Sequence, residues 1–256
     1  SACGAENLAY DQFSSWHGTQ VAGLIAAQSN NAYGMAGAGR DLRILPVRVL
    51  GTCGGLDSDI LAAMLWSAGL SVPGVPDNPN PARVINMSLG SGKPCNKSYA
   101  SVLSMLADKA VVVAAAGNDG GPVGAPANCP GVLAVAGLRH EGDKVGYSSF
   151  GKQVGISAPA GNCVNIGANE PCLYPMHTTS NSGLKGPAGP TMTDEFNYTV
   201  GTSFSAPLVS AAVGLMVDLN PELTPAQTMA RIKVAAKPFV RVTDVPFCDS
   251  ASELSQ

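Results

Sequence analysis

Short apolar runs alternate with segments of helical periodicity along most of this chain. Runs with few polar interruptions predict buried strands at 84–89, 110–116 and 132–136. Apolar and basic residues alternate over 42–50, which predicts another strand. Apolar residues three and four positions apart predict helices at 17–27, 59–68, 99–109, from Ser203 onward, and at 225–236.

The order of these elements indicates the fold class. Strands alternate with helices and are apolar throughout, which is typical of a mostly parallel sheet with helices on both faces. We therefore expect a three-layer α/β fold in a single domain over 1–256, because no internal repeat or second domain boundary is visible. Thr224 and Pro225 match the cap and first position of the last helix. The stretch 163–197 is polar and rich in Gly and Pro, and a loop of that length is usually functional or disordered.

Composition narrows the possible partners. The chain has 256 residues, 13% of them charged, and a formal net charge of −3. This charge gives no reason to expect nucleic acid or an anionic membrane surface as a partner. No apolar run approaches the roughly 18 residues of a membrane span. The abundance of Gly and small apolar residues suits a compact protein with closely packed helices.

Seven cysteines lie mostly in loops rich in Gly, Asn and Pro: Cys3, Cys53, Cys95, Cys129, Cys163, Cys172 and Cys248. Their spacing gives no zinc site, because no Cys-x-x-Cys pair occurs and His140 and His177 stand apart from them. Loop cysteines in extracellular proteins are usually disulfides, and buried free thiols of a cytosolic protein are the alternative. The odd count leaves one cysteine unpaired or bonded outside this chain.

Ser203 is the first candidate for chemistry. It follows Gly201 and Thr202, and a run of small apolar residues comes after it. That pattern predicts a nucleophile at the start of a buried helix, where free N–H groups and the positive end of the dipole favour negative charge on oxygen. A serine that only caps the helix is the alternative.

Two further motifs precede Ser203. His17 begins His-Gly-Thr-Gln-Val-Ala-Gly at the start of a predicted helix, and Asn118 follows Gly117 after an apolar strand. The order His, Asn, Ser, together with Val-Ile-Asn-Met-Ser-Leu-Gly at 84–90, resembles the subtilisin-like serine proteases (subtilases) over nearly the whole chain.

The resemblance implies a role for each of these residues. Ser203 would be the nucleophile, because a hydroxyl needs an adjacent base, and His17 would be that base. Asn118 and the Ser203 backbone N–H would stabilise the oxyanion of acyl transfer. The alternatives are a helix-capping His17 and an Asn118 that serves only the turn after its strand.

The resemblance also implies a binding site for an extended polypeptide. Two strands would face each other across the substrate, formed by Ser88, Leu89 and Gly90 and by Gly54, Gly55 and Leu56. The pocket for the P1 side chain would be lined by the first of these strands and by Ala115, Ala116 and Gly117. These pocket segments hold no acidic residue, which favours an uncharged P1 side chain. For Asp57 and Asp59, a solvated loop or helix cap is favoured over contact with basic substrate residues.

One part of the family pattern is absent from the sequence. Subtilases carry a catalytic Asp upstream of the His in an Asp-Ser/Thr-Gly context, and no such tripeptide occurs here. Glu6 and Asp11 are the carboxylates before His17, and neither follows an apolar run. We therefore expect a chain that begins after the Asp segment, lacks the first strand of the sheet and is truncated at both ends. The fragment itself would then be inactive.

A structural calcium site is a further implication of the resemblance. The loop 30–37 resembles the calcium loop of the family, with Ser29, Asn31, Tyr33 and Met35 as the oxygen donors. A metal-free turn rich in Asn is the alternative.

Topology and the resemblance together suggest how the cysteines pair. The expected disulfides are Cys3–Cys53, Cys95–Cys129 and Cys163–Cys172. Cys248 would remain unpaired near the surface, with its partner beyond residue 256.

These observations favour a secreted serine endopeptidase that acts through an acyl-enzyme. Its partners would be polypeptide substrates and a propeptide, where one exists, and it would be a monomer. We expect the Ser203 hydroxyl within hydrogen-bonding distance of His17, with Asn118 in the same cleft and no carboxylate of this chain on the far ring nitrogen. The alternative is a non-catalytic binding module that has lost the Asp. An α/β-hydrolase esterase would need Gly-x-Ser-x-Gly, which the sequence around Ser203 lacks.

Overall fold

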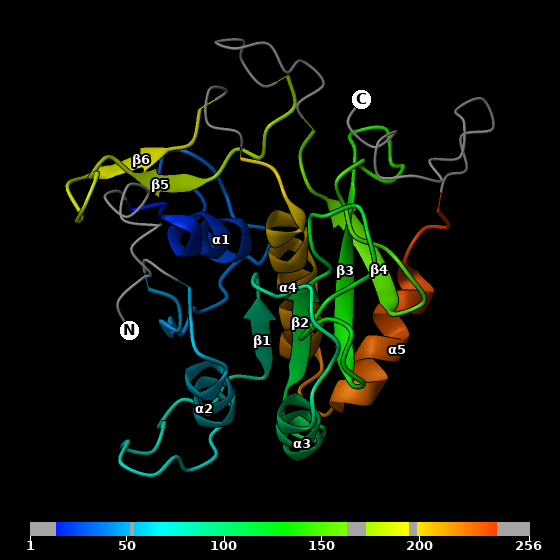
Figure 1. Cartoon of the computed structure of the whole chain (residues 1–256). Coiled ribbons are helices and arrows are strands. Elements are labelled where there is room, and N and C mark those ends of the chain that lie inside the picture. The colour runs from blue at the N-terminus through cyan, green and yellow to red at the C-terminus, as the bar shows by residue number, and fades with distance from the viewer. Residues whose placement is uncertain (1–13, 52–53, 163–172, 195–198, 240–256) are drawn as a thin grey trace, which may run out of the picture.

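A four-stranded parallel sheet forms the centre of the molecule (Figure 1). The computed structural model describes residues 14–51, 54–162, 173–194 and 199–239. The strands are β1 (Val84–Met87), β2 (Val111–Ala115), β3 (Val132–Leu138) and β4 (Val154–Pro159), and they lie side by side in the order of the sequence. All five residues of β2 are buried, as expected for a parallel strand that is covered on both faces.

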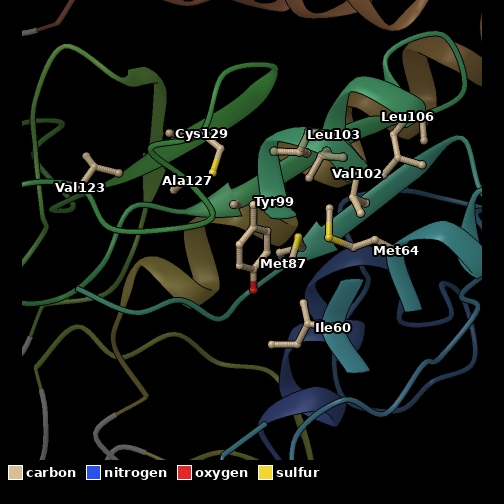
Figure 2. Close-up of a cluster of buried hydrophobic side chains, with 14 of the residues drawn as sticks. Ile60, Met64, Met87, Tyr99, Val102, Leu103, Leu106, Val123, Ala127 and Cys129 are labelled. Carbon is tan, nitrogen blue, oxygen red and sulfur yellow. The ribbon is translucent and has the colours of Figure 1, made fainter. Parts of the chain in front are cut away.

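Five helices cover this sheet and its carboxyl end. They are α1 (His17–Ala26), α2 (Asp57–Ser67), α3 (Lys97–Leu106), α4 (Thr202–Leu219) and α5 (Pro225–Ala235). Alternate residues of β2 pack on opposite sides: Val112 and Ala114 belong to the cluster with α2 and α3, and Val111 and Val113 to the cluster with α4 and α5. Figure 2 shows the first cluster, where Ile60 and Met64 of α2 lie near Tyr99 and the other apolar residues of α3. The three-layer α/β fold is confirmed.

The central helix α4 has the length and apolar character of a membrane span, with a mean hydropathy of 1.4. It is a core helix here, because it packs against all four strands and against α1 and α5. Ala206, Ala211 and Val213 are completely buried in this packing.

The predicted helices and three of the predicted strands are confirmed, with ends that shift by a few residues. The last helix begins with the expected cap, since the Thr224 hydroxyl accepts from the Gln227 N–H at 3.2 Å. The predicted strand at 42–50 is wrong. A strand needs a neighbour for its backbone groups, and this segment joins no sheet within the described part of the chain; Ile44, Val47 and Leu50 are about two-fifths exposed.

The polar stretch 163–197 contains regular structure that the sequence did not predict. Within its described part, β5 (Thr179–Asn181) and β6 (Pro190–Met192) form an antiparallel pair. These short strands have too few apolar residues to show a period. They are fixed instead by side chains that reach α1, where the hydroxyls of Thr178 and Thr179 donate to the carbonyls of Gln20 and Thr19 at 2.6 and 2.8 Å.

We expect Leu133→Ala to lower the free energy of unfolding by about 2–5 kcal/mol, because Leu133 is completely buried in β3 and its truncation leaves a cavity. Leu219→Ala is the matched control: Leu219 ends α4 and is 85% exposed, so its loss changes stability by less than about 0.5 kcal/mol. Urea unfolding measures both. Equal effects would contradict the assignment of β3 to the core.

Candidate active site

Ser203 lies at the second position of α4, on the carboxyl side of the sheet. Gly201 immediately before it has a φ of 147°, a conformation that side chains disfavour, and its N–H donates to the Ala160 carbonyl at 2.8 Å. This turn starts α4 at Thr202 and leaves Ser203 half-buried. Its own N–H has no acceptor among the described residues, as is usual in the first turn of a helix.

His17 is the first residue of α1, and the packing of α1 against α4 brings it to the start of α4. Its ring contacts the ring of Phe204 edge-on, with 5.8 Å between the centroids. Trp16 anchors the entry to α1, because its indole N–H donates to the Gly183 carbonyl at 2.6 Å. No local pattern predicts this anchor, because the partner lies 167 residues away.

The expected hydrogen bond between Ser203 and His17 is not made. The Ser203 hydroxyl donates to the Ser88 carbonyl at 3.5 Å, and no hydrogen bond joins it to the imidazole although both residues are described. The hydroxyl hydrogen of Ser203 turns about the Cβ–Oγ bond, so a nearby carbonyl competes with the ring as its acceptor.

Asn118 is fixed by Thr202, the residue before the nucleophile. Its side-chain oxygen accepts from the Thr202 N–H at 2.8 Å and from the Thr202 hydroxyl at 2.9 Å. The same hydroxyl accepts from the Gly117 N–H at 3.2 Å. With its oxygen held in this way, Asn118 keeps its amide N–H groups available as donors. Sequence reasoning missed the role of Thr202, because the contact joins residues 84 positions apart.

The two segments expected to line the P1 pocket lie next to each other. Met87 pairs with Ala114 in the register of β1 and β2, so Ser88, Leu89 and Gly90 continue beside Ala115, Ala116 and Gly117. The Ser88 hydroxyl donates to the Ser203 carbonyl at 2.7 Å, which brings both segments to the nucleophile. The pairing of Gly54, Gly55 and Leu56 with a substrate stays a prediction.

Asp57 and Asp59 both lie in the first turn of α2, in accordance with the favoured interpretation of a helix start. The Tyr99 hydroxyl donates to Asp57 at 3.2 Å and ties α3 to α2. Burial and the neighbouring Asp57 carboxylate raise the pKa of Tyr99 to about 12.

Cys95 and Cys129 form the expected disulfide, with 5.0 Å between their Cα atoms. It joins the segments that follow β1 and precede β3. The other two expected pairs, Cys3–Cys53 and Cys163–Cys172, and the unpaired Cys248 lie outside the described residues.

The expected calcium loop encloses a hollow of about 300 Å³, lined by residues 28–36. The loop offers neutral oxygen donors, because it contains no Asp or Glu. The Asn31 side-chain oxygen accepts from the Tyr33 N–H at 3.0 Å, so one of its lone pairs is engaged. Among the described residues, no three His, Cys, Asp or Glu side chains cluster as metal ligands. A Ca²⁺ ion in this loop would have only carbonyl and amide oxygens as ligands, and a carboxylate would have to come from elsewhere.

No carboxylate of the described residues makes an ion pair with His17. Glu6 and Asp11 lie outside the described part of the chain, so their relation to His17 stays a prediction. Burial alone lowers the pKa of His17 below its usual value of 6.5, because an imidazolium is poorly solvated there.

Comparison with known proteins identifies the family. Residues 5–250 match the model of the subtilase family, Peptidase S8. The chain belongs to the subtilase family.

Two curated relatives carry names that state an activity. The chain is 41% identical over 228 residues to an extracellular protease of Xanthomonas campestris pv. campestris, covering 88% of this chain and 36% of the relative. It is 37% identical over 223 residues to an extracellular basic protease of Dichelobacter nodosus, covering 84% of this chain and 34% of the relative. The chain thus spans about a third of the length of these relatives.

Solved structures agree with the fold. One of the proteases from Pseudoalteromonas arctica PAMC 21717 superposes with a TM-score of 0.82 at 38% identity, covering 89% of this chain and 66% of that one. A cold-adapted subtilisin-like serine proteinase superposes with a TM-score of 0.64 at 24% identity, covering 89% and 70%, which supports the fold alone.

We expect NMR titration of the His17 ring in the 256-residue chain to give a pKa below 6.5, because burial disfavours the charged ring. The imidazole is then neutral, and able to accept a proton, at every pH above about 6.5. The same signal in the unfolded chain provides the reference. A folded pKa above the unfolded one would show that an anionic group reaches the ring, contrary to the described surroundings.

Proposed function

We propose that this chain is the catalytic domain of a serine endopeptidase that cleaves polypeptides through an acyl-enzyme. The observations that support the proposal are contacts at the residues next to Ser203: the His17 ring meets the Phe204 ring, and the Asn118 side chain accepts hydrogen bonds from Thr202. His17, Asn118 and Ser203 come from two helix starts and one strand end, and a binding module has no need of all three. Membership of the subtilase family and the names of its relatives support the same activity.

The first half of the reaction forms the acyl-enzyme. The Ser203 oxygen attacks the carbonyl carbon of the scissile bond while His17 takes the hydroxyl proton. The carbonyl oxygen becomes an oxyanion, which accepts hydrogen bonds from the Ser203 N–H and the Asn118 amide. The C–N bond then breaks as His17 returns the proton to the leaving amine.

The second half restores the enzyme. A water molecule attacks the ester carbon, its proton passes to His17, and the same two donors stabilise the second oxyanion. His17 then protonates the Ser203 oxygen as the ester bond breaks and the acid product leaves. Before each cycle the Ser203 hydroxyl must turn from the Ser88 carbonyl to the imidazole, which is the movement that the resting geometry requires.

A carboxylate that orients His17 completes this mechanism in the proposal. It would hold the ring in the tautomer that accepts from Ser203 and would stabilise the imidazolium. The family resemblance assigns this role to an Asp, and no carboxylate of the described residues makes an ion pair with His17.

The substrate in this proposal is an extended segment of polypeptide with an uncharged P1 side chain. Its backbone would pair with 88–90 by strand addition, which gives affinity with little sequence preference. The walls of the P1 pocket, with Leu89, Ala115 and Ala116, are apolar, and burying an unpaired charge there would be costly.

An extracellular location is part of the proposal. The relatives are named extracellular proteases, and the Cys95–Cys129 disulfide is stable in an oxidising compartment. A structural Ca²⁺ would be held by Ser29, Asn31, Tyr33 and Met35 of the loop, whose neutral oxygens leave room for a further carboxylate.

Labelling with a fluorophosphonate tests the proposed activity. We expect the probe to modify Ser203 in the folded full-length gene product, because only an activated serine attacks its phosphorus. Peptide mapping locates the label. Ser203→Ala and His17→Ala should each abolish labelling, and heat-unfolded protein is the control. Failure of the folded wild type to react would favour the non-catalytic binding module instead.

Asn118→Leu should lower kcat by about 10²–10³-fold, the size known for the corresponding donor of subtilisin, with little change in KM. The reason is that this donor acts on charge that develops in the transition state. Steady-state cleavage of a chromogenic peptide measures both constants. Asp119→Ala, an exposed neighbour, should leave them unchanged. An equal rise in KM would instead assign Asn118 to substrate binding.

A further inference from the structure

The backbone carbonyl of Ser203 lacks its helical partner. In α4 it would accept from the N–H of the residue four positions later, but that residue is Pro207, which has no N–H. A buried carbonyl without a donor is costly, so another group must satisfy it. The Ser88 hydroxyl does so at 2.7 Å, from the end of β1.

Ser88 is itself held by two further side chains. The Asn86 amide donates to the Ser88 hydroxyl at 3.0 Å, and the Ser210 hydroxyl donates to the Asn86 oxygen at 2.9 Å. These three hydrogen bonds run in one donor-to-acceptor direction, from Ser210 through Asn86 and Ser88 to the Ser203 carbonyl. Such an arrangement strengthens each bond through the polarisation of the next one.

Both ends of the chain of hydrogen bonds are on α4. Ser203 and Ser210 are seven residues apart, which is two turns, and so they lie on the same side of the helix. Asn86 and Ser88 are two residues apart on and just after β1, and so they project to the same face. This series of hydrogen bonds therefore fixes the rotation of α4 about its axis and its distance from β1 at Ser203. Ser210 is 3% exposed, so water does not replace it easily.

We propose that Ser210, Asn86 and Ser88 form a positioning relay for the nucleophile, which rests on the proposed function. The relay holds the backbone of Ser203 through its carbonyl, while the Ser203 N–H stays free to donate to the oxyanion. Ser88 is also the first residue of the expected substrate strand, so the same hydroxyl keeps that strand and Ser203 in register. Ser210 contacts no reacting atom; it acts through Asn86 and Ser88.

The rate of fluorophosphonate labelling tests the relay. We expect Ser88→Ala and Ser210→Ala each to slow labelling by about tenfold or more, because the Ser203 carbonyl loses its fixed partner. Ser210→Thr keeps the hydroxyl and should recover most of the rate. Ser205→Ala is the matched control: this buried serine of α4 donates to the carbonyls of Ala158 and Pro159 and takes no part in the relay, so its rate should stay within about twofold.

Peptide cleavage separates positioning from binding. Ser210→Ala should lower kcat by about tenfold and leave KM within about twofold, because Ser210 touches no substrate. A wild-type rate for Ser210→Ala, or an equal loss for Ser205→Ala, would overturn the proposal.

A double-mutant cycle tests the relay without activity. If the three side chains act as one unit, the first substitution already breaks the relay and the second costs less. The fall in Tm of the Ser88→Ala, Ser210→Ala double variant should then be smaller than the sum of the two single falls, by about 2 °C or more. Ser88→Ala with Ser205→Ala should be additive. Additivity in both pairs of variants overturns the relay. Failure of the wild type to react with the fluorophosphonate instead refutes the proposed function, and the three side chains are then at most a structural connection.

Discussion

The site depends on the contact between the first turn of α4 and the carboxyl ends of the strands. Gly201 is pinned to Ala160 after β4, Thr202 to Asn118 after β2, and Ser203 to Ser88 after β1. Each bond joins residues that are distant in sequence, so none forms before the sheet and the helix have docked. The proposed nucleophile and its proposed oxyanion donors are therefore assembled by tertiary packing, and any loss of docking would separate them.

Small side chains make this close contact feasible. Ala206 and Ala211 are completely buried in α4, and Ala115 ends β2 on the face that packs against α4. A helix packed on larger residues would stand farther from the sheet, and hydrogen bonds below 3 Å between its backbone and the strand ends would be out of reach. The abundance of Gly and Ala in the sequence thus has a specific consequence at the site.

Local patterns predicted most of the fold and the main residues of the site, and the failures have physical reasons. The runs that became β2 and β3 are buried on both faces, so their composition is decisive. The segment 42–50 has the composition of a strand, but a strand also needs a neighbour, and no local pattern reports that. Thr202 and Trp16 were missed because their partners lie 84 and 167 residues away. Thr178 and Thr179 belong to the same class, since their hydroxyls rather than apolar side chains fix the hairpin to α1.

Pro207 shows how an unfavourable local choice contributes to a functional arrangement. Proline inside a helix removes one hydrogen bond and usually destabilises it. Here the missing N–H frees the carbonyl of the nucleophile itself, and that carbonyl becomes the acceptor for a side chain of the sheet. With a residue other than proline at 207, a helical N–H would compete with the Ser88 hydroxyl for this carbonyl. The hydrogen bonding of α4 therefore departs from the regular helical pattern at the point where the proposed positioning of Ser203 depends on a hydrogen bond between α4 and the sheet.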